Sequence, residues 1–181
     1  MTKQTASRMN MIVACDEAGG IGKEGKIPWS HLKEDIAQFS SLTKGTGDNA
    51  VIMGRATWDS LPERHKPLEG RMNVVVSSTK KQLDFPSSGV QHAKDIYEAY
   101  DWCNELGFKE IWIIGGEKIY KQFLEEAYID RICVTLIEGD YKCDRHFPIH
   151  DLKKYGYESF FSSRVKSQDD INFYFKEYVP N

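Results

Sequence analysis

The sequence predicts an α/β fold in which helices cover both faces of a mostly parallel central sheet, with an antiparallel strand at its C-terminal edge. Short apolar runs alternate with amphipathic stretches of helical period along most of the chain. These runs contain few polar residues, as strands covered on both faces do. The last two apolar segments, 157–161 and 171–178, have polar residues between them, which is typical of an antiparallel pair.

The expected elements follow in chain order. Strands are predicted at residues 9–15, 50–54, 73–77, 89–92, 111–114 and 131–137. Helices are predicted after Pro28-Trp29, from Arg55 or Ala56 to about Leu61, at 95–106 and at 117–126. Gly107 follows the third helix at the position where a glycine cap is common.

The first helix carries a candidate catalytic carboxylate. Its apolar residues have the i, i+4, i+7 spacing of one helical face: Leu32, Ile36 and Phe39. At about 100° per residue, Asp35 lies roughly 60° from Leu32, on the flank of that face, whereas Glu34 faces solvent. Burial raises the pKa of such a carboxyl, and such groups often carry out proton chemistry. The structural alternative is a carboxylate that only accepts a backbone N–H at the helix edge.

Length and composition indicate one globular domain over residues 1–181, with a flexible polar extension at residues 1–8. A net charge of −3 argues against nucleic acid and anionic membrane surfaces as partners. The four cysteines form no C-x-x-C pair, which favours free thiols in a reducing compartment. No stretch reaches the roughly 20 apolar residues of a membrane span. We therefore expect a cytoplasmic monomer.

Three loops are expected to meet at one edge of the sheet, because open parallel sheets bind ligands at the carboxyl ends of their strands. They are the loop before Asp35, the turn at Gly54-Arg55-Ala56-Thr57 and the turn at Gly115-Gly116. The second opens a helix whose N-terminus could hold phosphate, and paired glycines let a backbone pass close to a ligand. Ordinary strand-to-helix turns are the alternative for both. Residues 77–81 could hold another phosphate or form a solvated loop.

Two motifs match known ligand-binding patterns, but their sequence context argues against that function. Residues 20–25 match G-x-G-x-x-G, but four residues separate them from the strand and Pro28-Trp29 delays the helix, so we interpret them as a mobile lid. Cys143, His146 and His150 are residues of the types that bind metal ions. Pro148 breaks the helix that would align the histidines, and no paired thiols complete a tetrahedral set, so no metal site is expected.

Six stretches together resemble the dihydrofolate reductase family. In order, they are "IVACDEAGGIGKEGKIPW", "VIMGRATWDSLP", "PLEGRMNVVVSS", "IWIIGGEKIYKQFL", "ICVTLI" and "DRHFP". Their order and spacing are similar to those of the family over nearly all of residues 9–178. The resemblance implies an eight-stranded sheet with four helices, NADPH as hydride donor, 7,8-dihydrofolate as substrate and antifolates as inhibitors.

The resemblance also implies residue roles. Asp35 would hold the pterin 2-amino group and N3, Thr135 would bond this carboxylate, and Arg71 would take the glutamate α-carboxylate. The pterin and nicotinamide pocket would be lined by Ile12, Val13, Ala14 and Ile114, and the p-aminobenzoyl group by Ile36, Phe39, Leu61 and Leu68. Coenzyme contacts would come from Ala14, Ile21, Gly22, Gly54, Arg55, Ala56, Thr57, Ser77, Ser78, Thr79, Gly115, Gly116, Glu117, Lys118, Ile119 and Tyr120. The family's cis peptide would lie between Gly115 and Gly116.

Two other classes of function are alternatives. One is an NADPH reductase acting on a pyrimidine intermediate of riboflavin synthesis, which shares the coenzyme half of the fold but lacks the Asp35–Arg71 pair. The other is a non-catalytic relative with a structural or binding role. Asp35, Thr135 and Arg71 are all present, which favours a reductase of dihydrofolate over both.

Overall fold

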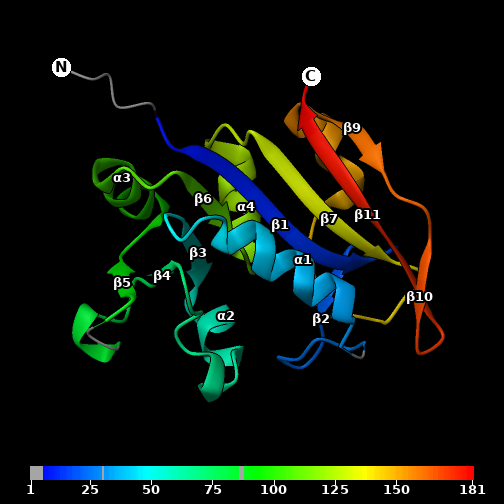
Figure 1. Ribbon diagram of the computed structural model, residues 1–181, viewed down its shortest axis with the longest axis horizontal. Helices are drawn as coiled ribbons and strands as arrows, with labels where there is room; N and C mark the ends of the chain where they lie inside the picture. Colours follow the sequence, from blue (N-terminus) through cyan, green and yellow to red (C-terminus); the bar gives the residue numbers. More distant parts are fainter. Residues whose placement is uncertain (1–5, 30, 86–87) are drawn as a thin grey trace.

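Nine strands form one sheet in the computed structural model, which describes residues 6–29, 31–85 and 88–181 (Figure 1). Its parallel part runs in the order β5 (Val90–Ala93), β4 (Met72–Val76), β3 (Ala50–Gly54), β6 (Glu110–Ile113), β1 (Arg8–Asp16) and β7 (Arg131–Ile137). β11 (Ile171–Pro180) then pairs antiparallel with β7. The predicted fold class is confirmed.

Two short strands share the outer edge of β11. β10 (Lys166–Gln168) pairs with the start of β11, and β9 (Tyr157–Ser162) pairs with its end, from Lys176 to Pro180. Both are antiparallel to β11. The described sheet is therefore eight strands wide, as the resemblance implied, and its last position is divided between β9 and β10.

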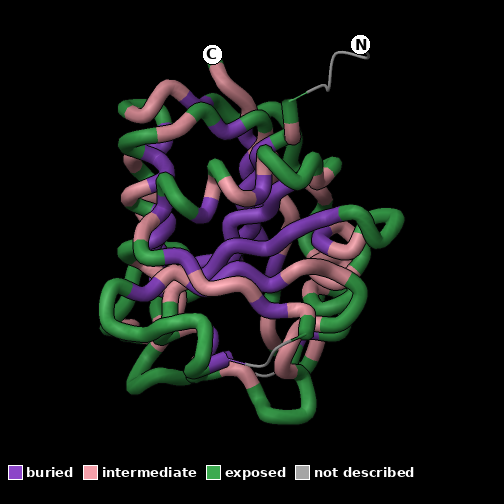
Figure 2. Tube along the Cα trace, turned by 90° about the vertical axis from the view of Figure 1, so that its left-hand side faces the viewer, coloured by how far each residue is buried: buried purple, intermediate pink, exposed green. Residues whose placement is uncertain are grey.

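Different helices cover the two faces of the sheet. α3 (Ile96–Leu106) and α4 (Glu117–Glu126) pack on one face, in a core with alternate residues of β1: Met9, Met11, Val13 and Cys15. α1 (Lys33–Lys44) and α2 (Arg55–Ser60) contribute to the core on the other face, which includes Ile12. In Figure 1 α1 crosses in front of β1, and Figure 2 shows buried strands through the middle of the molecule.

α3 begins and ends at capping residues. Asp95 caps α3 by accepting the Glu98 amide at 2.9 Å, and Gly107 ends that helix with a φ of 72°, as predicted. α1 begins at Lys33 and continues to Lys44, beyond the apolar spacing that predicted it. Its added turn is anchored by Thr43, which is fully buried although it is polar.

Several short elements differ from the prediction. β2 (Gly20–Gly22) forms part of the expected lid and pairs antiparallel with β8 (Arg145–His146). β4, β5 and β6 are each displaced by one residue from the expected ranges. Three 3₁₀ helices lie outside the predicted helices and strands: η1 (Glu63–His65), η2 (Gln82–Asp84) and η3 (Ile149–Tyr155). Except for η3, these additional elements have only two or three residues and are too short to show a sequence period.

The remaining global features concern the N-terminus, thiols and membrane. Residues 1–5 of the expected extension lie outside the described residues, and Arg8 is already the first residue of β1. All four cysteines are free thiols. Among the described residues, no helix has the length and apolarity to cross a membrane, and no group of His, Cys, Asp or Glu side chains could hold a metal ion.

Candidate active site

The centre of the site is a carboxylate on α1 that is bonded to a hydroxyl on β7. Thr135 Oγ1 donates to Asp35 Oδ1 at 2.5 Å, and Thr135 lies opposite Ala14 in the parallel pairing of β1 with β7. Burial raises the pKa of Asp35 above its ordinary value, and the bond from Thr135 lowers it by a smaller amount. This carboxyl is therefore easier to protonate than a solvated aspartate.

The next residue in the chain behaves as a surface charge. The Glu34 side chain is 57% exposed and accepts the Lys166 Nζ at 2.6 Å. Neighbouring carboxylates in the first turn of α1 thus have opposite surroundings, as the helical spacing predicted. Ile36, beside Asp35, remains 48% exposed and is available to an apolar ligand group.

Apolar residues from several elements form one wall beside Asp35. One core cluster brings together five of the predicted contacts: Ile12, Ile114, Phe39, Leu61 and Leu68. Val13 was also predicted to line this pocket. Its side chain lies in the opposite core with α3 and α4, because alternate strand residues face opposite sides. Only the backbone of Val13 can face the site.

Arg71 is held against the C-terminal half of α1. Its Nη1 donates to Thr43 Oγ1 at 2.5 Å, and its guanidinium carbon lies 5.9 Å from the centre of the Phe39 ring. Thr43 Oγ1 in turn donates to the Phe39 carbonyl at 2.7 Å. Burial lowers the pKa of Arg71, but a guanidinium stays charged at neutral pH. The arrangement leaves a positioned cation for an anionic ligand.

Asn73 supports the loop that carries this cation. The sequence analysis did not predict this role for Asn73. The Asn73 side chain is fully buried and bonds the Leu68 amide and carbonyl, each at 2.9 Å, and the Arg71 carbonyl at 3.0 Å. These bonds fix the loop that carries Leu68 and Arg71. The only polar residue in the apolar run of β4 was the signal that could have identified it.

Two strand-to-helix turns meet at the paired glycines. The Gly54 amide donates to the Gly115 carbonyl at 2.8 Å, and the peptide between Gly115 and Gly116 is cis, as the resemblance implied. Gly115 has a φ of +113°, and a Cβ there would lie 3.0 Å from the Tyr120 ring and hydroxyl. A Cβ on Gly116 would lie 3.2 Å from Thr57 Oγ1. Neither glycine therefore has room for a side chain unless its neighbour shifts.

α4 links this turn to β1. Tyr120 is buried and donates its hydroxyl to the Ile12 carbonyl at 2.8 Å. Burial, and then the nearby Cys15 and Asp35, raise the pKa of Tyr120, so the phenol stays protonated and remains a donor. Ile119 was predicted to contact the coenzyme. Its side chain packs in the core against Gly54, which leaves only its backbone to a ligand.

The end of β4 offers a second polar loop. Ser77 is buried, and its Oγ accepts the Lys80 amide at 3.0 Å, while Ser78 and Thr79 remain exposed. His92 Nε2 lies 2.7 Å from the Ser77 carbonyl, which can only accept, so Nε2 carries the proton. His92 was not predicted, because its partner is fifteen residues away in the chain.

The other predicted coenzyme contacts surround the glycine turns. Arg55 and Ala56 are exposed, and Arg55 Nη1 contacts Asp59 Oδ2 at 2.7 Å. Lys118 is exposed, and Glu117 Oε1 accepts the His146 amide at 3.1 Å. Ile21 and Gly22 lie half-buried in the lid. The first turn of α4 has no side-chain cap, so its amides can bind an anion.

Comparisons with known proteins agree with this geometry. The family model described as dihydrofolate reductase matches residues 8–180. The dihydrofolate reductase of Sus scrofa is 34% identical over 96% of this chain and 98% of its own length. That of Schistosoma mansoni is 41% identical over 81% of both chains. The bifunctional dihydrofolate reductase-thymidylate synthase 2 of Arabidopsis thaliana is 32% identical over 99% of this chain and 33% of its own. The chain therefore belongs to the dihydrofolate reductase family.

Proposed function

We propose that this chain reduces 7,8-dihydrofolate to 5,6,7,8-tetrahydrofolate with NADPH, in support of one-carbon metabolism and thymidylate synthesis. The observation that carries the proposal is the Asp35–Thr135 pair beside an apolar wall, next to the paired glycines. A half-buried carboxylate with one orienting hydroxyl can accept two parallel N–H donors. The 2-amino group and N3 of a pterin present such a pair.

Asp35 then orients the ring and favours its protonation. Its raised pKa allows it to hold a proton near neutral pH more readily than a solvated carboxylate would. The pterin N5 gains its proton through water that enters past the lid. Ile12 and Ile114 exclude other water from the ring, because both side chains are buried in the same apolar wall.

The coenzyme site fits a nicotinamide dinucleotide phosphate. NADPH supplies the hydride that reaches C6 of the pterin. Gly54, Gly115 and Gly116 let the two turns pack closely beside the proposed coenzyme site, since a Cβ at each position would meet a neighbouring side chain at 3.0–3.2 Å. The amides of α4 and the exposed hydroxyls of Ser78 and Thr79 suit its phosphates.

Arg71 is assigned to the glutamate α-carboxylate of the substrate. Arg71→Ala should raise the KM for dihydrofolate about tenfold or more, the value of one hydrogen bond between charged groups, with little change in kcat. Arg64→Ala, at an exposed arginine of the same loop region, is the control. An unchanged KM in Arg71→Ala would remove this role.

The direct test is the loss of NADPH absorbance on adding dihydrofolate to the purified chain. Oxidation should require both substrates and should stop when an antifolate is added. Absence of turnover with dihydrofolate, or turnover only with a pyrimidine substrate, would contradict the proposal. The chain is further proposed to act as a cytoplasmic monomer, and its four free thiols fit a reducing compartment.

A further inference from the structure

His92, on β5, is held by three contacts. Its amide donates to Gln82 Oε1 at 2.7 Å, and its ring stacks on the Phe85 ring, with centroids 6.0 Å apart and planes at 14°. Its Nε2 donates to the Ser77 carbonyl at 2.7 Å. Gln82 Nε2 also donates to the Val90 carbonyl at 3.2 Å, so this side chain bridges two residues of β5. The imidazole therefore has a fixed position beside the end of β4.

The His92 ring also belongs to a packed aromatic group. The Phe85 ring on which it stacks meets the Trp58 ring edge-on, with centroids 5.9 Å apart and planes at 77°. Trp58 is buried on α2, directly after Thr57. A change at His92 therefore affects packing as well as hydrogen bonding, and a test of its role must separate the two.

Residues 77–81, here called the β4 loop, begin where β4 ends. Ser77 is buried, and its amide donates to the Ala93 carbonyl of β5 at 2.9 Å. Its Oγ accepts the Thr79 amide at 3.4 Å and the Lys80 amide at 3.0 Å. The β4 loop is thus folded around the Ser77 side chain, and the Ser77 backbone is attached to β5.

The bond from His92 sets the direction of the next amide. The Ser77 amide and carbonyl both point toward β5, as the two groups of one strand residue do. The peptide between Ser77 and Ser78 is trans, so the Ser78 amide points to the opposite side. That side holds β3 and its last residue, Gly54, which pairs with Val76. No described residue accepts the Ser78 amide, which leaves it available to an anionic ligand group.

The order of the strands indicates which ligand group this would be. From β1, beside Asp35, the sheet continues through β6 and β3 to β4. The carboxyl ends of β6 and β3 carry the two glycine turns, whose helix N-termini suit the pyrophosphate of the proposed coenzyme. With the nicotinamide near Asp35, the adenosine lies at the β4 end. Its 2′-phosphate is the only group by which NADPH differs from NADH.

We propose that His92 is a positioning residue that makes the site prefer NADPH to NADH. By holding the Ser77 carbonyl, it aims the Ser78 amide at the 2′-phosphate without touching the coenzyme itself. Without this bond the peptide is free to turn, and a carbonyl oxygen facing the phosphate would repel it. The inference rests on the proposed function, because it requires a nicotinamide coenzyme at this edge of the sheet.

Two substitutions separate the hydrogen bond from the packing of the ring. His92→Phe keeps an aromatic ring against Phe85 but has no donor for the Ser77 carbonyl. His92→Gln loses the ring but supplies an NH₂ donor. If the bond matters, glutamine should be the better replacement, whereas a role in packing alone predicts that phenylalanine is better.

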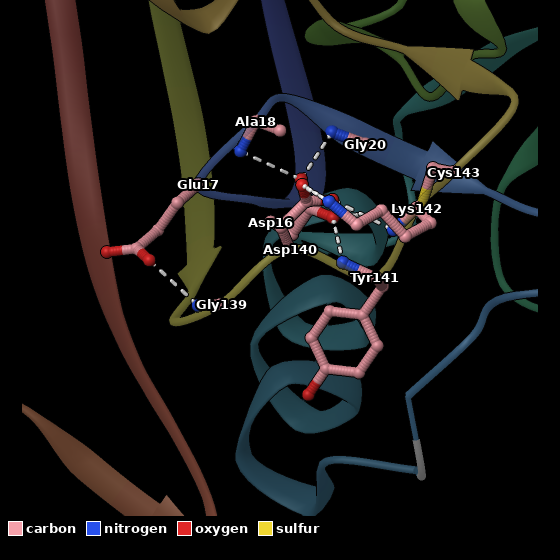
Figure 3. A network of polar contacts seen from close by, with 9 residues as sticks. All are labelled: Asp16, Glu17, Ala18, Gly20, Gly139, Asp140, Tyr141, Lys142 and Cys143. Atoms are coloured by element: carbon pink, nitrogen blue, oxygen red, sulfur yellow. Dashed lines mark hydrogen bonds and ion pairs between the residues drawn. The ribbon is translucent and has the colours of Figure 1, made fainter.

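His150→Phe is a matched control, because His150 makes the same kind of contact outside the β4 loop. Its Nε2 lies 2.7 Å from the Glu17 carbonyl. The chain beside Glu17 is also held by Asp16, which is buried and accepts the amides of Ala18 at 3.0 Å and Tyr141 at 2.9 Å (Figure 3). Loss of the His150 contact should therefore leave the ratio of NADPH to NADH affinity unchanged.

The measurement is the Kd of each variant for NADPH and NADH, from fluorescence titration without dihydrofolate. Adenosine 2′,5′-bisphosphate and adenosine 5′-phosphate serve as probes of the adenosine end with and without the 2′-phosphate. We expect His92→Phe to weaken binding of NADPH and the bisphosphate about tenfold, the value of one hydrogen bond to a charged group, and to leave the other two within about twofold. His92→Gln should recover most of the lost affinity.

Equal losses of NADPH and NADH affinity in His92→Phe would overturn the proposal, because they would indicate packing alone. A glutamine variant no better than the phenylalanine variant would do the same. The ¹⁵N shifts of the imidazole above about pH 8, where histidine is neutral, give a test that needs no variant. The Nε2–H tautomer is expected, and an Nδ1–H tautomer would remove the bond to Ser77. This measurement decides the matter if His92→Phe does not fold.

Failure of the proposed function would look different. A chain that binds NADPH selectively through His92 but does not reduce dihydrofolate would refute the proposed function alone. A chain that reduces dihydrofolate, but whose preference for NADPH is the same in His92→Phe, would refute the role of His92 alone. Binding of neither coenzyme would overturn both.

Discussion

The two halves of the site depend on different parts of the chain, one on side chains and the other on glycines. The half proposed to bind the pterin, here called the pterin half, depends on side chains with assigned partners: Asp35 on Thr135, and Arg71 on Thr43. The half proposed to bind the coenzyme, here called the coenzyme half, is built around Gly54, Gly115 and Gly116, where a Cβ would meet a neighbour, with exposed polar side chains nearby. Removing a side chain should therefore damage the first half most, whereas adding one should damage the second. The predictions below test this difference.

The largest effect is expected on the pterin side. Asp35→Asn should lower the rate of hydride transfer at pH 7 by about 10²–10⁴-fold, the range of general acid–base catalysis, because the amide cannot help to protonate the pterin. Acid should relieve part of the loss, since protons then reach N5 from solvent. Transfer is measured in single turnovers with NADPH and its C4-deuterated form.

Glu34→Gln is the control for Asp35→Asn, since it removes the neighbouring exposed carboxylate and a surface pair with Lys166. Its rate should stay within about twofold of the unsubstituted chain, because such surface pairs contribute little. Equal losses in Glu34→Gln and Asp35→Asn would show that the site depends on total charge rather than on one placed carboxyl.

The next largest effect tests the coenzyme half by adding a side chain to one of its glycines. Gly115→Ala places a Cβ 3.0 Å from the Tyr120 ring, so the turn must shift and NADPH binding should weaken roughly 10–100-fold, as overpacking of about 1–3 kcal/mol would cause. The measurement is the Kd from fluorescence titration. Gly116→Ala should have a smaller effect, because only Thr57 Oγ1 lies near its Cβ.

Gly47→Ala separates backbone strain from the close approach at Gly115. Its φ is +98°, but no atom lies within 4 Å of the added Cβ. It should lower stability and leave the Kd for NADPH unchanged. Similar Kd values in Gly115→Ala and the unsubstituted chain would contradict a backbone-built coenzyme site.

A smaller effect concerns stability, which Asp35→Asn should raise although the same change lowers the rate of hydride transfer. Because the pKa of Asp35 is raised in the folded chain, folding favours its protonated form. Stability from this group is complete below the unfolded pKa of about 3.9 and decreases as pH rises through the folded value. Asp35→Asn carries no such penalty, so its Tm should exceed that of the unsubstituted chain at pH 7. The gap should close below about pH 4, and a gap that does not vary with pH would contradict the argument.

Much of the fold could be predicted from the sequence because the buried strands are long enough to show their character. The runs at β1, β3 and β7 are mostly apolar and lie where they were expected, within one residue at each end. β2 and β8 have three and two residues, and they pair only because β8 lies beside the lid in space. Such pairings between distant segments leave no local pattern.

The position of Asp35 in the site could be predicted, because its angle around the helix decides which side it faces. Side-chain direction on the elements was harder, and the side chains of Val13 and Ile119 lie in the core on the α3–α4 side. The supporting residues were missed because their partners are distant in sequence: 28 residues separate Thr43 from Arg71, and 125 separate Asp16 from Tyr141. An isolated polar residue within an apolar run was the available signal for Asn73.

The smallest effect concerns the exposed cation of the coenzyme half. Arg55 and Asp59 form an i, i+4 pair on α2 at 2.7 Å, and their side chains are 46% and 54% exposed, a geometry typically worth about 0.2–1 kcal/mol. If Arg55 leaves Asp59 to contact a coenzyme phosphate, Arg55→Ala should raise the KM for NADPH by roughly two- to fivefold. Asp59→Asn frees the same arginine, so it should lower this KM slightly. Both changes should weaken at high salt, because exposed charges are screened. Opposite signs in the two variants would place Arg55 in the coenzyme half, whereas equal signs would indicate that the pair only stabilises α2.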